Sequence, residues 1–287
     1  MKNILIVGEN SYIGCSFGKW VKEKETEVED VSSRENRWKQ KDFGAYDAIL
    51  HVAGIAHVNA AADMEAMYYA VNRDLTIDVC RKAKEEGAGQ FVFLSSIIVY
   101  GESSSLEPMV ITKDTKPSPN GFYGQSKLEA EEGILPMADS QFIVSVVRPP
   151  MVYGRDSKGN YPRLAKLAKR CPIFPDFPNQ RSMIHIDNLC ECIWKIIENG
   201  QGGIFFPQNK EYVATTDLVK EIARQQGKRI HTTRLANGIL RFMAKKINLV
   251  NKVFGSLVYD KELSDCFQWE YCVWDFKETI EQTEGRE

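Results

Sequence analysis

The sequence predicts an α/β protein built on a doubly wound parallel sheet, followed by a smaller α/β domain. In the first half of the chain, short apolar runs of the kind that parallel sheets bury alternate with segments whose apolar residues have helical spacing. The earliest run, residues 4–7, ends at a glycine and leads directly into helical sequence. Strands that alternate with helices favour a parallel sheet with right-handed crossovers.

The expected elements follow in order along the chain. The strands are expected at residues 2–8, 28–31, 46–54, 90–96, 141–149 and 203–207. The helices are expected at residues 11–24, 64–86 and 122–132. Breakers support these bounds, because Pro149 and Pro150 stop the fifth strand while Gly133 and Pro136 follow the third helix.

The local amino-acid composition changes after Pro150. Prolines and aromatic residues cluster at residues 171–180, which predicts a loop. A helix is expected at residues 215–226, with Thr215 or Thr216 as its N-cap. These features indicate that a second domain begins near this point.

Residues 230–258 are basic and amphipathic. We favour the interpretation that they pack a mixed protein surface over the alternative of a membrane-surface helix. The expected domains are a cofactor domain over residues 1–154, rejoined by a late strand near 203–207, and a mainly substrate-binding domain over residues 155–287.

The composition is that of an ordinary globular protein. The chain has 287 residues, 43% of them hydrophobic, and a formal net charge of −2, which excludes disordered and fibrous classes and gives no sign of nucleic-acid binding. Its seven cysteines are scattered, and His51 and His185 lie in apolar, strand-like sequence, so no metal site is expected. The unspaced cysteines suit a reducing cytoplasm, and the N-terminal apolar run is too short for a signal peptide or a membrane span.

A glycine-rich turn joins the first strand to the first helix. It contains Gly8, Ser11 and Gly14, and small residues there let the backbone approach a pyrophosphate. The N-terminus of the helix adds free N–H groups and the positive end of the helix dipole. This context predicts a Rossmann-like dinucleotide site, and the alternative is a tight strand-to-helix turn without a ligand.

The sequence just after the second strand would recognise the adenosine ribose of the cofactor. An acidic residue there favours NAD, whereas an arginine favours the extra phosphate of NADP. One strand register places Asp30 at the ribose, and the next places Ser32 there with Arg34 close by. The sequence leaves the register open, because Val28 and Val31 are three residues apart, and we lean to NADP.

Tyr123 and Lys127 are the catalytic candidates. Residues four apart share one face of a helix, so the Lys127 ammonium is expected near the phenol and the nicotinamide ribose, where it would lower the pKa of Tyr123 and bind the cofactor. The pair could then act as general acid and base while hydride moves to or from a nicotinamide. The same spacing occurs by chance on surface helices, but Ser96 ends a buried strand, where open α/β sheets hold ligands.

Together these residues resemble the NAD-dependent epimerase/dehydratase family of extended short-chain dehydrogenases, over nearly the whole chain. The motifs that carry the resemblance are HVAG at 51–54, YYAVN with Asn72, SSIIVYG at 95–101, Tyr-x-x-x-Lys, RPPMVYG at 148–154, QRSMIHIDN at 180–188 and FQWE at 267–270. Their order and spacing are those of the family.

The resemblance implies roles for individual residues. The catalytic residues would be Ser96, Tyr123 and Lys127. The residues around the cofactor would be Gly8, Ser11, Tyr12, Ile13, Gly14, Ala53 and Gly54, with Asp42 at the adenine. The substrate would meet Asn72, and its phosphates would meet Arg181 and Lys252. The family often dimerises through the helices that carry Asn72 and Tyr123, so a homodimer is expected.

Two departures from the family narrow the expected reaction. Ile97 and Ile98 stand where dehydratases carry an Asp-Glu pair, and neither can move a proton. Met151 stands where UDP-galactose 4-epimerases carry an asparagine, so the contacts to the diphosphate must differ. The expected activity is redox chemistry at carbon 4 of a UDP sugar by a cytoplasmic enzyme of polysaccharide biosynthesis, as a 4-epimerase. The alternatives are an NADPH-dependent 4-keto-sugar reductase and a non-catalytic cofactor sensor, a class that generally lacks the tyrosine and lysine.

Overall fold

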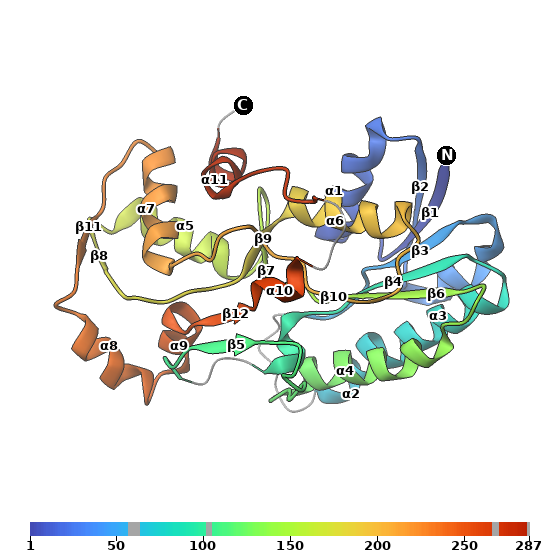
Figure 1. Cartoon of the computed structure of the whole chain (residues 1–287), viewed down its shortest axis with the longest axis horizontal. Coiled ribbons are helices and arrows are strands. Elements are labelled where there is room, and N and C mark those ends of the chain that lie inside the picture. Colours follow the sequence, from blue (N-terminus) through green and yellow to red (C-terminus); the bar gives the residue numbers. More distant parts are fainter. Residues whose placement is uncertain (57–63, 102–104, 266–269, 286–287) are drawn as a thin grey trace. The chain divides into compact units, whose positions relative to one another are not determined.

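The computed structural model describes the whole chain apart from residues 57–63, 102–104, 266–269 and 286–287 (Figure 1). The chain divides into two compact units. Unit 1 comprises Met1–Gly101, Lys116–Pro149 and Leu189–Pro207, and unit 2 comprises Glu102–Thr115, Pro150–Asn188 and Gln208–Glu287. The two units differ from the expected domains in three places, because residues 102–115 and 150–154 belong to unit 2 and the return to unit 1 begins at Leu189 rather than near 203.

Unit 1 is built on a six-stranded parallel sheet with the order β10-β6-β4-β3-β1-β2. The strands are β1 (Lys2–Val7), β2 (Thr26–Val31), β3 (Ala48–His51), β4 (Gln90–Leu94), β6 (Ile143–Val147) and β10 (Gly203–Phe205). This confirms the predicted fold class. The strand order reverses at β1, between β2 and β3, and the carboxyl ends of strands at such a switch point are where doubly wound sheets bind ligands.

Burial on both faces explains why the central strands read as continuous apolar runs. Residues Ile4–Val7 of β1 are at most 3% exposed, and all four residues of β3 are buried. By contrast, β2 lies at the edge of the sheet and most of its side chains are at least partly exposed. Its sequence signal is correspondingly weaker.

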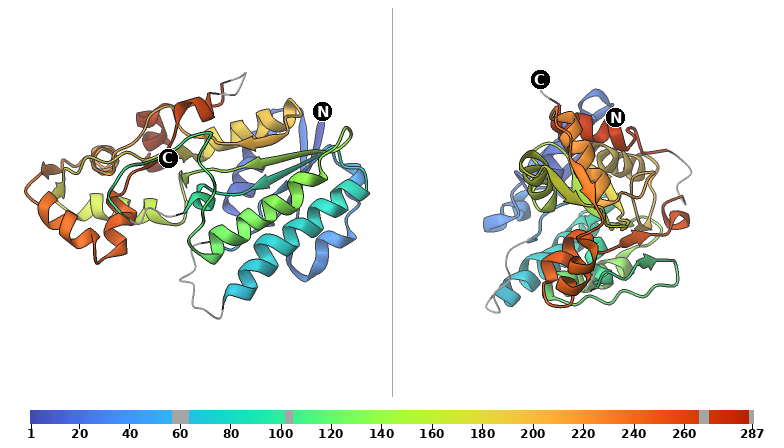
Figure 2. Two further views of the ribbon diagram at one scale, coloured as in Figure 1. Left: turned by 60° about the horizontal axis from the view of Figure 1, so that its bottom comes forward. Right: turned by 90° about the vertical axis from the view of Figure 1, so that its left-hand side faces the viewer.

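Helices pack on both faces of this sheet (Figure 1). α1 (Tyr12–Trp20) and α6 (Ile186–Glu198) lie on one face, where the indole of Trp20 donates to Glu191 at 2.7 Å. On the other face, α4 (Phe122–Ile134) lies beside the helix expected at residues 64–86 (Figure 2). That helix consists of α2 (Glu65–Tyr68), the π-helical turn η5 (Tyr69–Asp74) and α3 (Leu75–Glu85).

Unit 2 contains three pairs of short parallel strands and a set of helices. The pairs are β7 (Met151–Tyr153) with β9 (Met183–His185), β5 (Met109–Ile111) with β12 (Leu257–Tyr259), and β8 (Ile173–Pro175) with β11 (His231–Thr233). The helices are α5 (Asn160–Arg170), α7 (Thr215–Gln225), α8 (Asn237–Ala244), α9 (Asn248–Phe254), α10 (Lys261–Ser264) and α11 (Phe276–Glu284). The loop expected at residues 171–180 therefore includes a strand, because β8 pairs with β11 and buries Phe174 against Phe254.

The N-terminus of α7 differs from the prediction. Its N-cap is Ala214, which has no capping side chain, and Thr215 and Thr216 are the first two residues of the helix. Their hydroxyls instead donate to the carbonyls of Val253 at 2.6 Å and Pro175 at 2.9 Å. The prediction of a threonine cap was wrong because these hydroxyls bond to distant segments of the chain.

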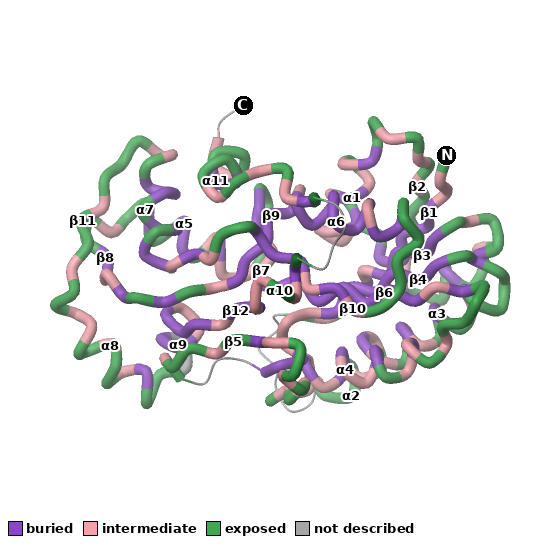
Figure 3. Tube along the Cα trace, in the orientation of Figure 1, coloured by how far each residue is buried: buried purple, intermediate pink, exposed green. Residues whose placement is uncertain are grey.

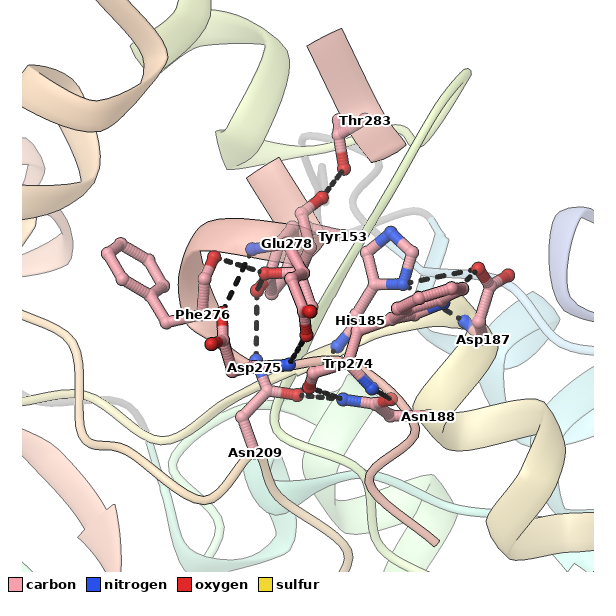
Figure 4. Close-up of polar contacts among 11 residues, drawn as sticks. Tyr153, His185, Asp187, Asn188, Asn209, Trp274, Asp275, Phe276, Glu278 and Thr283 are labelled. Carbon is pink, nitrogen blue, oxygen red and sulfur yellow. Dashed lines mark hydrogen bonds and ion pairs between the residues drawn. The ribbon is translucent and has the colours of Figure 1, made fainter. Parts of the chain in front are cut away.

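Side-chain hydrogen bonds tie the C-terminal segment of unit 2 to the start of α6 (Figure 4). The amide of Asn188 donates to the carbonyl of Trp274 at 3.2 Å and accepts from its N–H at 3.1 Å, and the indole of Trp274 donates to Asp187 at 3.1 Å. His185 is buried beside this contact, and burial lowers its pKa to about 4. Among the described residues, no helix combines the length and apolar character needed to cross a membrane.

Candidate active site

The glycine turn lies at the carboxyl end of β1, beside the end of β3. Gly8 has a φ of +134°, and a Cβ at this position would lie 2.8 Å from the backbone nitrogen of Ala53, so only glycine fits. Ser11 is the N-cap of α1, and its hydroxyl accepts a hydrogen bond from the backbone N–H of Gly14 at 3.1 Å. A strand end, a close backbone approach and a helix N-terminus together fit the pyrophosphate of a dinucleotide.

The two other turn residues predicted to meet the cofactor, Tyr12 and Ile13, open α1. On the neighbouring strand, the residues that follow β2 lie level with the turn. The backbone carbonyl of Val31, the last residue of β2, accepts hydrogen bonds from the N–H groups of Gly8 and Glu9. Ser32 is therefore the first residue after the strand, and Arg34 follows two residues later.

The register between β1 and β2 indicates which residue lies where the cofactor ribose would bind. Asp30 is an exposed strand residue opposite Ile6, whereas Ser32 and Arg34 lie beyond the end of β2. This arrangement favours the second of the two registers left open by the sequence. Asp42, predicted at the adenine, accepts from the backbone N–H of Gly44 at 3.0 Å and is the N-cap of the short helix η3 (Phe43–Ala45). Its contact with an adenine stays a prediction.

Ser96 and Tyr123 are brought together at the carboxyl end of β4. Ser96 is the second residue after the strand, and its side chain forms a hydrogen bond with the phenol of Tyr123. The Ser96 hydroxyl also accepts from the backbone N–H of Ile98 at 3.3 Å, which orients it. The ring of Tyr123 packs against that of Tyr68, with centroids 6.1 Å apart. A substrate oxygen at this phenol would therefore meet two hydroxyl groups.

Lys127, one turn further along α4, is buried beneath this pair. Its ammonium donates to the carbonyl of Leu94 at 2.8 Å and lies 4.4 Å from the centroid of the Phe93 ring. Burial lowers the pKa of Lys127 to about 7, and the charge of Glu131 opposes this shift. Lys127 also lies against the end of β3, because a Cβ on Gly54 would be 3.2 Å from its ammonium.

The expectation that Lys127 lowers the pKa of Tyr123 was wrong for this structure. Burial raises the pKa of Tyr123 to about 12, and the hydrogen bond from Ser96 offsets only part of that shift. The reason is that the ammonium of Lys127 is directed at the Leu94 carbonyl. At neutral pH the phenol of Tyr123 therefore holds a proton and can donate it.

Asn72, expected at the substrate, is instead fully buried. Its side-chain oxygen accepts from the backbone N–H of Ile55 at 2.8 Å, and its amide donates to the carbonyl of Ile55 at 3.1 Å and the hydroxyl of Ser126 at 3.2 Å. These bonds use the polar atoms of the side chain, which corrects the prediction. Asn72 connects the segment after β3 to α4, and so fixes the position of the helix that carries Tyr123 and Lys127.

Sequence reasoning missed a buried polar network that includes Glu131 of α4. Glu131 lies one turn after Lys127 and receives two hydrogen bonds of 3.1 Å from Arg148, as well as one from the hydroxyl of Ser95. Arg148 also donates to the phenol of Tyr100 at 2.8 Å. Glu131 follows Lys127 by four residues on the same helix face, and that spacing was the available signal.

In unit 2, Arg181 and Lys252 line one cavity of about 330 Å³. The guanidinium of Arg181 donates to the backbone carbonyls of Lys252 and Val253. Burial lowers the pKa of Arg181, and no carboxylate of the described residues contacts its guanidinium. A partly buried guanidinium that has only carbonyl partners is suited to binding an anion.

The rest of this cavity is mainly apolar. Leu164 and Leu167 of α5 lie on its wall with Val213 and Leu218, and Met151 of β7 also lines it. The residue that departs from the epimerase pattern therefore lies in the same cavity as the two predicted phosphate-binding residues. The C-terminal motif at 267–270 lies mostly outside the described residues.

The sequence is similar to those of known proteins. Residues 4–206 match the NAD dependent epimerase/dehydratase family. The UDP-glucose 4-epimerase of Vibrio cholerae is 28% identical over 249 residues, which cover 77% of this chain and 75% of that protein. The N-acetyl-alpha-D-glucosaminyl-diphospho-ditrans,octacis-undecaprenol 4-epimerase of Escherichia coli O157:H7 is 22% identical over 276 residues, which cover 88% of this chain and 81% of that protein.

Solved structures show the same fold. The UDP-glucuronic acid 4-epimerase from Bacillus cereus in complex with NAD superposes with a TM-score of 0.73 at 17% identity, covering 98% of this chain and 97% of that one. A dTDP-4-dehydrorhamnose reductase from Bacillus anthracis in complex with NADP gives a TM-score of 0.72 at 16% identity, covering 99% and 98%. At these identities the likeness concerns the fold alone.

Proposed function

Because the chain belongs to the NAD dependent epimerase/dehydratase family, a family of nucleotide-sugar epimerases and reductases, we propose that it performs redox chemistry at carbon 4 of a UDP sugar, as a 4-epimerase. It is an NAD(P)-dependent enzyme of the extended short-chain dehydrogenase type, with NAD or NADP as its cofactor. The observation that carries the proposal is the hydrogen bond between Ser96 and Tyr123 at a strand end, one helical turn from the buried Lys127. The similarity to the 4-epimerase of Vibrio cholerae supports the choice of reaction.

The residues of unit 1 would divide the work as follows. The Gly8–Gly14 turn and the N-terminus of α1 would hold the cofactor's pyrophosphate. The chemistry that NAD(P) supplies at such a site is reversible hydride transfer. Tyr123 donates its proton to the oxygen on carbon 4 during reduction and takes it back during oxidation. Ser96 holds the phenol and the same oxygen in place.

The cavity of unit 2 would hold the nucleotide part of the substrate. Arg181 offers its guanidinium to the diphosphate, and the apolar wall formed by Leu164, Leu167 and Leu218 suits a nucleobase. A volume of about 330 Å³ is enough for a small ligand group. Lys252, on the same cavity, would add a second cation.

Arg34 favours NADP as the cofactor. It lies two residues beyond Ser32, close to where a ribose phosphate would be bound. Arg34→Ala should weaken NADP binding by about 1–3 kcal/mol, as expected for a lost charge-assisted hydrogen bond, and leave NAD binding nearly unchanged. Titration of both cofactors by fluorescence decides the point, and equal changes for the two would make Arg34 an ordinary surface charge.

Two related activities differ from this proposal in one respect each. A 4-keto-sugar reductase is favoured by the raised pKa of Tyr123, because a protonated phenol is ready to donate to a ketone oxygen. A sugar carried on a polyprenyl diphosphate is suggested by the relative from Escherichia coli, and it has the same diphosphate for Arg181 to bind. The homodimer expected from the family stays a prediction.

One experiment separates these activities. The purified protein is incubated with NAD or NADPH and a panel of UDP sugars, 4-keto sugars and polyprenyl-diphosphate sugars, and the products are followed by NMR. A 4-epimerase interconverts epimers without net cofactor consumption, whereas a reductase oxidises one NADPH per 4-keto sugar. No 4-keto-6-deoxy product should accumulate, because Ile97 and Ile98 supply no acid or base for water elimination. Accumulation of that product, or no turnover of any sugar by cofactor-loaded protein, contradicts the proposal.

A further inference from the structure

An exposed apolar stripe runs along α8 in unit 2. Leu235, just ahead of the helix, is 92% exposed, while Ile239 and Phe242 within it are 64% and 63% exposed. In Figure 3 most of this segment is coloured as exposed. Ile239 and Phe242 are three residues apart and share one face of the helix, and Leu235 lies in the turn that precedes the helix. Isolated exposed apolar residues are ordinary, but a stripe of three bulky ones is a surface feature.

The opposite face of α8 accounts for its packing. Leu240, Met243 and Ala244 pack against the core of unit 2. The outer stripe of Leu235, Ile239 and Phe242 is therefore not needed to hold the helix in place. The sequence alone favoured packing against protein for the whole segment, and the structure limits that packing to the inner face.

Cations flank the apolar stripe. Arg241, Lys245 and Lys246 are exposed, and the ammonium of Lys246 lies 5.3 Å from the centroid of the Phe242 ring. Neither Arg241 nor Lys245 has a carboxylate partner among the described residues. Of the nearby cations, Arg234 is paired, with Asp176 at 2.8 Å.

The sequence around this surface contains no acidic residue. Residues 222–259 include no Asp or Glu, although the chain as a whole carries a formal net charge of −2. The Lys and Arg residues in that range are Arg224, Lys228, Arg229, Arg234, Arg241, Lys245, Lys246 and Lys252. The segment that exposes the apolar stripe therefore carries cationic but no acidic side chains.

We propose that the α8 surface, formed by Leu235, Ile239, Arg241, Phe242, Lys245 and Lys246, docks on an anionic lipid bilayer. Bulky aliphatic and aromatic side chains enter the boundary between headgroups and acyl chains, and flanking cations bind anionic headgroups. A helix with this pattern lies in the plane of the membrane surface without spanning it.

Charge and shape distinguish this partner from two others. Nucleic acid would attract the cations but would leave Leu235, Ile239 and Phe242 in water. A second copy of the chain would bring Arg241, Lys245 and Lys246 against their own counterparts, because a two-fold interface is self-complementary. An anionic bilayer satisfies both the charge and the apolar stripe, whichever sugar the active site uses.

The test is flotation of the full chain with vesicles of phosphatidylcholine, either alone or mixed with phosphatidylglycerol. Wild-type protein should float with the anionic vesicles, and high salt should release most of it. The double variant Arg241→Gln/Lys245→Gln should lower the partition coefficient roughly 30-fold, at about 1 kcal/mol for each cation and 1.4 kcal/mol for each tenfold. Ile239→Ser/Phe242→Ser should abolish flotation without changing the thermal unfolding midpoint, since both side chains are exposed.

Matched controls come from the same unit. Ile173→Ser removes another exposed apolar side chain, 59% exposed on β8, and Lys169→Gln/Arg170→Gln removes two exposed cations of α5. Both should float like the wild type. The proposal is overturned if wild-type protein does not float, if it floats equally with uncharged vesicles, or if the control variants lose as much as the α8 variants. It is also overturned if light scattering shows a dimer that Phe242→Ser separates, or if the α8 cations bind RNA in preference to vesicles.

Discussion

Two arginines, the buried Arg148 in unit 1 and the partly buried Arg181 in unit 2, have different kinds of partner. Arg148 forms hydrogen bonds with Glu131 and with the phenol of Tyr100. Arg181 donates to the carbonyls of Lys252 and Val253, and no carboxylate of the described residues contacts it. A buried cation that is matched by a carboxylate can be structural, whereas one held only by carbonyls retains the capacity to bind an anion. The comparison therefore favours a structural role for Arg148 and supports the proposed role of Arg181 in ligand binding.

The largest expected effect breaks the matched pair. Arg148→Met should lower the free energy of unfolding by about 3–5 kcal/mol, because Glu131 is left buried without its counter-charge. Arg81→Met, which breaks an exposed pair with Asp78, should cost less than about 1 kcal/mol. Urea denaturation of both variants checks the difference. Similar losses of unfolding free energy for the two variants would mean that burial does not determine how much an ion pair contributes to stability.

Lys127 is also a buried cation. The carboxylate that acts on it, Glu131, is already bound by Arg148. The folded protein releases the proton of Lys127 near pH 7, whereas an unfolded lysine keeps it to about pH 10.4. Between these values the unfolded state binds more protons, so stability should rise with pH.

The effect of Lys127 is read as a difference between two proteins. From pH 7 to 9, wild-type protein should gain about 2–3 kcal/mol relative to Lys127→Met, at 1.36 kcal/mol for each pH unit. Taking the difference removes the contribution of other titrating groups, provided they titrate alike in both proteins. Parallel stability profiles would show that Lys127 stays charged in the folded protein.

The smallest expected effect concerns Arg181. Arg181→Gln should raise the KM for a nucleotide sugar by about 10- to 100-fold, the equivalent of one hydrogen bond to a charged group. It should leave the free energy of unfolding unchanged or higher, because the cost of burying an unmatched charge is removed. Arg229→Gln, a change at an exposed arginine, is the control. An unchanged KM together with a large loss of stability would give Arg181 the role assigned to Arg148.

Much of the fold could be predicted because its strands are buried on both faces. β1, β3, β4 and β6 appear in the sequence as continuous apolar runs that end at glycine, serine or proline. The π-helical turn at Tyr69–Asp74 and the strand β8 could not be predicted. Both depend on contacts between distant segments, which local periodicity does not record.

The site was predictable where a motif fixes it and unpredictable where burial does. The spacing of Tyr123 and Lys127 and the strand end at Ser96 indicated the catalytic group. The orientation of the Lys127 ammonium toward Leu94 reversed the expected pKa shift of Tyr123. The role of Asn72 also depends on which atoms surround its amide, and the sequence contains no record of those neighbours.

The central claim is that Tyr123 moves the proton at carbon 4, and Tyr123→Phe tests it most directly. The variant keeps the ring that packs against Tyr68 and removes the hydroxyl that Ser96 contacts, so folding and cofactor affinity should survive. Turnover of a confirmed sugar substrate should fall by about 10²–10⁴, the usual contribution of a positioned general acid and base. Lys127→Ala, measured alongside, should weaken cofactor binding as well as turnover. If Tyr123→Phe keeps most of its turnover while its cofactor affinity equals that of the wild type, the proposed mechanism is wrong.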